Sequence, residues 1–277
     1  MKYFGKPAGM WAVFGGSFRR ELVRCFGLSG QSARETARKA KKKYRELIGR
    51  LPEFEKADRF MTNEVNCAML AAFILSMPER PDVQRLTDYY ARAMMTGLVR
   101  RVFRASGKSQ FTEKDIEGMR RTAALRAGDR NPYSWNMDFY EYPDGSGYEA
   151  RFSRCGICTL MQELGLQDLT PALCHLDYTM AEARGSATFV REYTLASGGP
   201  YCDCGYKNGR SEKECPPAGS REGACFLLSG GQMCSIWPDK TKTPASVGTQ
   251  GLHRMVRGTG LEPVTPCTSS MCSSQLS

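Results

Sequence analysis

The side chains whose chemistry could support catalysis or ligand binding are concentrated in one stretch of this sequence, residues 154–207. This stretch contains five of the twelve cysteines and one of the two histidines. It also contains Asp177, Arg191, Thr194 and Asp203, which carry a carboxylate, a guanidinium or a hydroxyl group. We therefore expect the functional site to be built mainly from these residues.

The cysteines of this stretch occur in pairs that could bind a metal ion. Two residues separate Cys155 from Cys158, one residue separates Cys202 from Cys204, and Cys174 lies between the pairs. Closely spaced cysteines can ligate one zinc ion, which prefers four such ligands in a tetrahedron. Alternatively, Cys158 is a small apolar residue of the core. The spacings therefore allow a bound divalent metal ion but do not identify a cofactor.

Cys174 and Asp177 are three residues apart in a predicted helix and should share one of its faces. A carboxylate beside a cysteine raises the pKa of the thiol, which argues against a cysteine nucleophile. His175 points about 100° away around the helix, so we do not expect a Cys–His dyad. We interpret Asp177 as a residue that positions water, with Cys174 shaping the pocket or binding metal. The alternative is an ordinary surface aspartate beside a core cysteine.

Two further polar residues follow in predicted strands. Arg191 lies among apolar residues, where its planar guanidinium could hold a substrate carboxylate or form a salt bridge at the rim. Asp203 follows a glycine-containing turn and could accept a proton, bind metal or cap the turn.

The elements that must position these residues follow from the spacing of apolar side chains. In the first half this spacing is helical, with Gly27 as a stop signal and Thr112 as an N-cap whose partner is Asp115. The predicted helices cover 8–27, 30–49, 59–77, 82–103 and 113–126. The helix over 59–77 is apolar almost all round, which is typical of a central packed helix.

After Gly128 the pattern changes to alternation, which is typical of half-buried strands. We predict strands over 135–140 and 148–155, helices over 156–164 and 172–183, and strands over 188–195 and 201–207. Thr170 and Pro171 are the expected N-cap and first residue of the second helix. The fold class is therefore α+β: a helical N-terminal half, then a helix-covered antiparallel sheet, in the order helices-β-β-α-α-β-β.

Composition suggests three regions along the chain. Residues 1–128 form a helical region, and residues 129–208 form an α+β region that packs with it as one domain. Residues 209–277 are rich in Gly, Pro, Ser and Cys without periodicity, so we expect a disordered tail. The segment 257–267 resembles a tail found on unrelated translated bacterial reading frames. We hypothesise that the residues beyond about 208 come from a frameshift or read-through, which peptides of 257–277 from the natural protein would contradict.

The location and partners follow from charge and apolar runs. The longest apolar run, 67–77, is too short to span a bilayer, and no signal peptide is recognisable. We expect a cytoplasmic protein with reduced thiols, no membrane partner and a small-molecule substrate.

The net charge of +10 is concentrated in residues 1–50, where 13 Lys or Arg face three Glu. Such an end could bind nucleic acid or an anionic membrane, but it lacks an aromatic stacking platform, so a solvated helix face is favoured. We therefore do not expect nucleic acid as a partner. The sequence does not decide whether the protein forms a homo-oligomer.

The combination of motifs in 154–207 resembles the L-2-amino-thiazoline-4-carboxylic acid hydrolase family, and residues 1–150 resemble its helical N-terminal region less specifically. His175, Cys158 and Cys204 fall outside the pattern. The motifs are Arg154-Cys155, Glu163-Leu164-Gly165, Leu169-x-Pro171-x-Leu173-Cys174-x-x-Asp177, Arg191-x-x-Thr194-Leu195-Ala196-x-Gly198 and Cys202-Asp203.

The resemblance implies a bacterial hydrolase that opens a thiazoline ring on a route of L-cysteine biosynthesis through a carbamoyl-cysteine. Asp177 would act as general base or water positioner and Arg191 as a clamp for the substrate carboxylate. The catalytic set expected from the resemblance is Asp177, Cys174 and Asp203, and the substrate-binding set is Arg191, Thr194, Cys202 and Cys155. The alternative is a sensor module that binds a small molecule without turnover.

Overall fold

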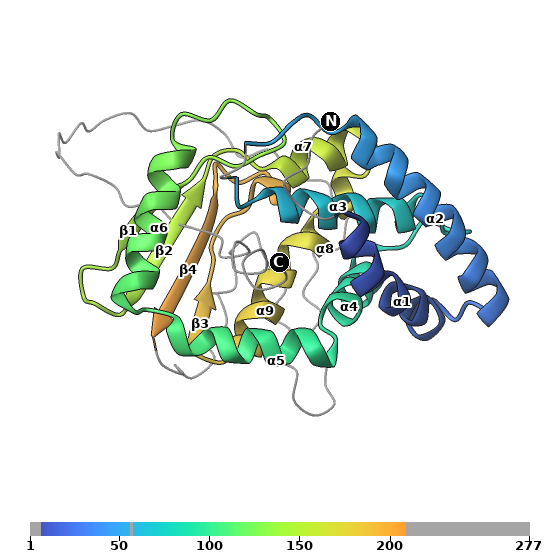
Figure 1. Ribbon diagram of the computed structural model, residues 1–277, viewed down its shortest axis with the longest axis horizontal. Helices are drawn as coiled ribbons and strands as arrows, with labels where there is room; N and C mark the ends of the chain where they lie inside the picture. The colour runs from blue at the N-terminus through green and yellow to red at the C-terminus, as the bar shows by residue number, and fades with distance from the viewer. Residues whose placement is uncertain (1–6, 56–57, 209–277) are drawn as a thin grey trace, which may run out of the picture.

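The computed structural model describes residues 7–55 and 58–208, and its first half is helical, as predicted (Figure 1). The predicted tail, 209–277, lies outside the described residues. The helices of the first half are α1 (Pro7–Phe26), α2 (Gly30–Arg50), α3 (Met61–Ile74), α4 (Val83–Met94), α5 (Gly97–Ser106) and α6 (Glu113–Arg126). Gly27 follows α1 with a φ of 67°, which is the left-handed conformation expected at a helix stop.

The single helix predicted over 82–103 is wrong, because the structure divides it into α4 and α5. The side chain of Asp82 caps α4 by accepting a hydrogen bond from Arg85 N at 2.8 Å. Thr96 then caps α5 by accepting from Val99 N at 3.4 Å. A threonine at this position satisfies a free N–H of the second helix and so allows a new helix to begin.

The second half contains an antiparallel four-stranded sheet in the order β1-β2-β4-β3. Its strands are β1 (Asp138–Glu141), β2 (Gly147–Phe152), β3 (Ala187–Val190) and β4 (Cys202–Asn208). Tyr148 pairs with Tyr206, and Phe152 pairs with Cys202. Because side chains alternate along a strand, this register places three buried side chains of each strand on one face: Tyr148, Ala150 and Phe152 of β2, and Cys202, Cys204 and Tyr206 of β4.

The helices between β2 and β3 are α7 (Gly156–Glu163), α8 (Pro171–Cys174) and α9 (Leu176–Arg184). The single helix expected over 172–183 is therefore divided at His175. Pro171 occupies the first turn as expected, but the side chain of Thr170 makes no capping hydrogen bond. Short 3₁₀ helices occupy Gly107–Ser109, Gln167–Leu169 and Leu195–Ser197.

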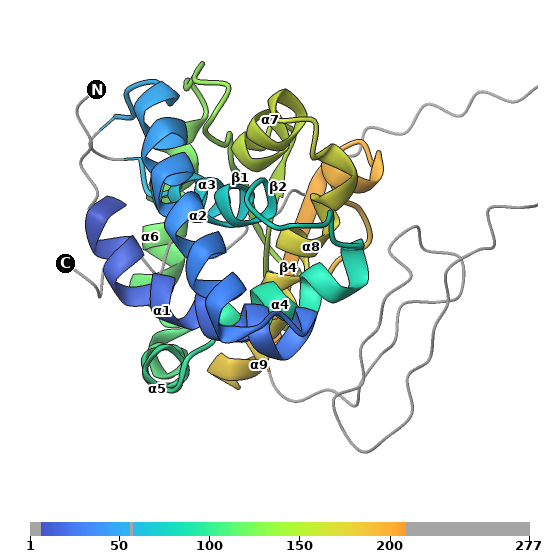
Figure 2. The same cartoon turned by 90° about the vertical axis from the view of Figure 1, so that its right-hand side faces the viewer.

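Two hydrophobic cores result from this layout. Phe18, Leu70 and Phe73 belong to the helical core, while Phe60 and Trp135 belong to the core beneath the sheet. Contacts of α3 with α7, α4 with α8 and α5 with α9 join the two halves. In Figures 1 and 2, α1 and α2 lie on the far side of α3 from the sheet.

The outer face of α2 carries much of the positive charge of the chain. Lys39, Lys41 and Lys42 are exposed, whereas Ala40 and Tyr44 of the same helix are buried. Within 7–55 and 58–208, none of the helices combines the length and apolar character needed to cross a membrane.

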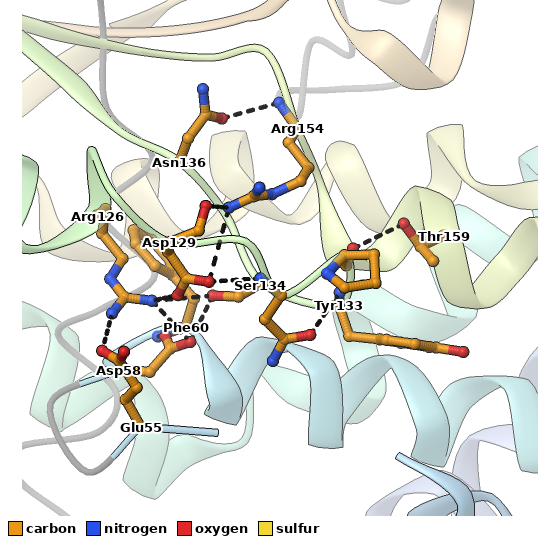
Figure 3. Close-up of polar contacts among 12 residues, drawn as sticks. Glu55, Asp58, Phe60, Arg126, Asp129, Tyr133, Ser134, Asn136, Arg154 and Thr159 are labelled. Atoms are coloured by element: carbon orange, nitrogen blue, oxygen red, sulfur yellow. Dashed lines mark hydrogen bonds and ion pairs between the residues drawn. The ribbon is translucent and has the colours of Figure 1, made fainter. Parts of the chain in front are cut away.

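A buried charge network fixes the loop between α6 and the sheet (Figure 3). The Arg126 side chain is 1% exposed and donates to Asp58 Oδ2 at 3.0 Å and to Glu55 Oε2 at 2.9 Å, and it also contacts Asp129. Arg154 donates from Nη2 to the Asp129 carbonyl at 2.8 Å. A buried guanidinium is tolerated only when it is paired and hydrogen-bonded, so this network holds three chain segments together.

Candidate functional site

A cavity lies where the helical core meets the core beneath the sheet. Tyr90, Leu173 and Met180 line it from the helical side, and Trp135 and Phe152 line it from the sheet side. The cavity has a volume of about 80 Å³. A water molecule needs about 10–15 Å³ of such space, so this cavity has room for a small organic molecule. Apolar cavities with a few converging polar groups are typical ligand sites.

The charged groups of the cavity are Asp177 and Arg191, which form an ion pair. Arg191 Nη2 lies 2.5 Å from Asp177 Oδ2, and the two side chains are 2% and 10% exposed. Asp177 belongs to the first turn of α9, whereas Arg191 directly follows β3. The expectation that Arg191 and Thr194 lie in a strand is wrong, since β3 ends at Val190.

The Arg191 guanidinium also bonds to the protein on its other sides. Nε donates to the Asp203 carbonyl and Nη1 to the Cys174 carbonyl, both at 3.0 Å. Nη2 donates to Cys204 Sγ at 2.7 Å. The guanidinium therefore ties together α8, α9 and β4, and its planar fork fixes the orientation of the Asp177 carboxylate.

Four cysteines line the cavity: Cys155, Cys174, Cys202 and Cys204, and none of them forms a disulfide with another described residue. Cys202 Sγ accepts a hydrogen bond from Leu195 N at 3.3 Å. In the described part of the chain, no three His, Cys, Asp or Glu side chains are arranged to hold a metal ion. The motif pattern omitted Cys204, but its spacing of two from Cys202 already predicts a shared strand face.

Two asparagines of α3, Asn63 and Asn66, also line this cavity and were not predicted from the sequence. Asn66 is 8% exposed, and its Oδ1 has no hydrogen-bond partner among the described residues. A buried carbonyl oxygen of this kind is an acceptor for a donor inside the cavity. The available signal was that the polar residues of this largely apolar helix, Thr62, Asn63, Glu64 and Asn66, gather at its N-terminal end.

Asp203 and Thr194 do not line this cavity but hold the adjacent loop. The Asp203 carboxylate accepts hydrogen bonds from Tyr193 N at 2.6 Å and Glu192 N at 2.7 Å. Thr194 Oγ1 accepts from Ser197 N at 3.1 Å and caps the short 3₁₀ helix. Burial raises the pKa of Asp203, while the two backbone N–H groups and Arg191 oppose that rise. Both residues thus position the loop that begins at Arg191.

His175 lies between α8 and α9 and does not belong to the cavity lining. Burial lowers its pKa, the positive charge of Arg191 lowers it further, and Asp177 opposes both. A histidine with a pKa below its ordinary value is a neutral imidazole at pH 7. The charged pair Asp177–Arg191 therefore dominates the local electrostatics.

A small, largely apolar cavity with a buried carboxylate held by a guanidinium is the kind of site at which proteins bind or convert small molecules. The sequence profile of one family, described as L-2-amino-thiazoline-4-carboxylic acid hydrolase, matches residues 28–206. The chain belongs to this family, which the motifs in 154–207 had indicated. No curated protein and no solved structure matches the chain.

Proposed function

We propose that this protein is a hydrolase that opens the ring of L-2-amino-thiazoline-4-carboxylate, or of a similar small cyclic substrate, to give a carbamoyl-cysteine. The oxygen of one water molecule bonds to the ring carbon that carries the amino group. One ring bond from that carbon breaks. If it is the bond to sulfur, one proton of the water ends on the sulfur and the other on the ring nitrogen; if it is the bond to nitrogen, both end on that nitrogen. The buried Asp177–Arg191 pair, in a cavity of a chain that belongs to this family, carries the proposal.

Asp177 is the proposed general base or water-positioning residue. Its Oδ2 is bound by Arg191 at 2.5 Å, so the carboxylate is held in one orientation at the cavity wall. A carboxylate can accept a proton from an attacking water in the transition state, and such groups typically contribute about 10²–10⁴-fold to the rate. Cys174, at the end of α8, lies on the same wall and is the proposed proton donor to the departing atom.

The substrate-binding groups proposed from the geometry surround this pair. Arg191 supplies the positive charge that attracts the substrate carboxylate, and it holds Asp177 in place. Cys155 and Cys202 form the walls on the sheet side. Asn66 Oδ1 is the acceptor for the amino group of the substrate. Thr194 and Asp203 support the loop that carries Arg191. We therefore propose that they position this loop, in place of the substrate-binding role expected for Thr194 and the catalytic role expected for Asp203.

The experiment compares the full chain with its Asp177→Asn variant on L-2-amino-thiazoline-4-carboxylate, with and without a chelator, and detects the product by mass spectrometry. We expect the wild type to add one water to the substrate and the variant to react about 10²–10⁴-fold more slowly. We expect the variant to fold, because asparagine keeps an oxygen that can accept a hydrogen bond from Arg191. Circular dichroism checks this expectation.

Asp168→Asn is the matched control, because Asp168 is exposed, its partner is Arg80, and neither residue lines the cavity. It should hydrolyse the substrate at the wild-type rate. Wild-type turnover by Asp177→Asn would refute the assignment of Asp177. Wild-type protein that retains the thiazoline acid without converting it would instead favour a ligand-binding module.

A further inference from the structure

Cys155 and Cys158 form a thiol pair at the start of α7. Cys155 is the N-cap residue of this helix, and Cys158 is its third residue. The Cys158 side chain raises the pKa of the Cys155 thiol, so the two groups lie close to each other. Cys155 is 8% exposed and Cys158 is partly exposed, so only Cys158 is open to an incoming molecule. This difference in exposure assigns the reactive position to Cys158.

The backbone around the pair is held on both sides by the loop that precedes the sheet (Figure 3). Arg154 N donates to Asn136 Oδ1 at 2.9 Å, and Thr159 Oγ1 donates to the Pro132 carbonyl at 2.8 Å. At Gly156, between the two cysteines, an added Cβ would lie 2.2 Å from the Tyr133 carbonyl oxygen. Only glycine fits there, so the Cys-Gly-Ile-Cys turn is a rigid site.

A buried carboxyl group packs against this turn. Glu64 of α3 is 0% exposed, and neither of its carboxyl oxygens has a hydrogen-bond partner among the described residues. Its Oε2 lies 2.8 Å from the position that a Cβ on Gly156 would occupy. Burial raises the pKa of Glu64 well above its ordinary value, and the neighbouring Cys158 side chain, followed by burial, raises the pKa of Cys155. Burial therefore favours the protonated form of both groups.

We propose that Cys155 and Cys158 are a redox-active dithiol that exchanges with a low-molecular-weight disulfide. Cys158 loses its proton and attacks one sulfur of the disulfide, whose S–S bond breaks and releases one small thiol. Cys155 then attacks Cys158 Sγ, and the second small thiol leaves. Two protein thiols are oxidised, one small disulfide is reduced, and the two protons end on the released thiols. Glu64 is placed to pass on the proton of Cys155.

This site is separate from the proposed hydrolysis, although Cys155 also belongs to the cavity wall. The exchange needs no ring substrate and no Asp177. Its test therefore succeeds or fails independently of the hydrolase assignment.

The test equilibrates the full chain with glutathione buffers of increasing oxidised fraction, blocks free thiols with an alkylating reagent and cleaves after glutamate. Cleavage after Glu163 and before Cys155, with trypsin acting at Arg154, releases a peptide that contains Cys155 and Cys158 as its only cysteines. As the buffer becomes oxidising, we expect this peptide to appear without alkyl groups and two hydrogen atoms lighter than the dithiol peptide. Cys25, a partly exposed thiol on α1, is the internal control and should form only a mixed disulfide with glutathione.

Two serine variants separate the roles of the two thiols. Cys155→Ser should accumulate a mixed disulfide at Cys158, because the second thiol is missing. Cys158→Ser should leave Cys155 alkylated throughout. Glu64→Gln should slow closure of the disulfide, so that the mixed disulfide persists longer than in the wild type. A peptide that stays doubly alkylated in oxidising buffer, or a disulfide from Cys155 to Cys67 of α3, would overturn the proposal.

Discussion

The ion pair between Asp177 and Arg191 is buried, and its surroundings limit what each partner can do. A buried pair stabilises a fold only when further hydrogen bonds satisfy the remaining donors and acceptors. Arg191 meets this condition through two carbonyls and the sulfur of Cys204, besides Asp177. The guanidinium is thus fixed in the wall, which suits it to orient Asp177 and to attract a carboxylate by charge.

Glu64 should make the stability of the protein depend on pH. Its folded-state pKa is raised well above the ordinary value of 4.5 because it is fully buried. The unfolded chain therefore releases this proton at a lower pH than the folded chain. The contribution of Glu64 is fully present below the unfolded pKa and is lost as the pH rises toward the folded pKa, by up to about 1.4 kcal/mol per pH unit.

Glu64→Gln removes this dependence, since glutamine does not titrate. Relative to the wild type, the variant should gain stability as the pH is raised above 4.5. Urea unfolding of both proteins at a series of pH values measures the difference. A difference that stays constant across the series would show that Glu64 titrates alike in both states.

The loop between β3 and β4 shows how one element positions the site. Arg191, at its start, reaches the cavity, and Asp203, at the beginning of β4, binds the backbone of the next two loop residues. The carboxylate thus replaces the strand hydrogen bonds that end at Val190. Without it, the loop would lose the conformation that directs Arg191 toward Asp177.

Asp203→Ala should therefore destabilise the protein by about 1–3 kcal/mol, because it leaves backbone N–H groups without an acceptor. Asp203→Asn keeps one acceptor oxygen and should lose less stability and retain turnover. Chemical denaturation and the rate of thiazoline hydrolysis are measured together. If Asp203 instead acts as a catalytic base, Asp203→Asn would abolish turnover while leaving the unfolding free energy unchanged.

Most elements could be predicted from the sequence, because their apolar spacing and caps agree with the structure. The helix breaks at Thr96 and His175 could not be predicted, because each lies inside a continuous helical pattern of apolar residues and depends on packing and local capping. In the site, the cysteines and Asp177 were recognisable by spacing and motif. Asn66 and Glu64 were not, because they come from a helix some ninety residues before the motifs and only tertiary structure brings them there.

Gly156 tests how tightly α7 is held against its neighbours. Gly156→Ala would place a methyl group 2.2 Å from the Tyr133 carbonyl oxygen and 2.8 Å from Glu64 Oε2. We expect a loss of about 1–3 kcal/mol from overpacking. Gly118→Ala in α6 is the matched control, because nothing lies within 4 Å of its added Cβ. That variant should gain about 0.5–1 kcal/mol in thermal or urea unfolding, and equal losses in both variants would contradict the account.

At the scale of the whole molecule, the cavity exists because two cores meet without merging. The helical core supplies Tyr90 and Leu173, the sheet core supplies Phe152 and Cys204, and the ion pair lies between them. Junctions between two hydrophobic cores are common ligand sites, because each core is packed around its own helices and strands and leaves space where the two meet. The site therefore depends on both halves of the chain being present together.

This dependence predicts where the chain can be shortened. A protein that ends after Asn208 should keep the melting temperature and hydrolysis rate of the full chain. Its strand β4 pairs with both β2 and β3, and the family match ends at residue 206. A protein that ends after Pro200 is the control, because it lacks β4 and with it Cys202 and Cys204 of the cavity. It should fail to fold, since β2 and β3 would lose their shared partner. Thermal unfolding and thiazoline turnover are measured for the full chain and the two shortened proteins. If the chain ending at Asn208 aggregates or loses activity, residues 209–277 contribute to the working protein.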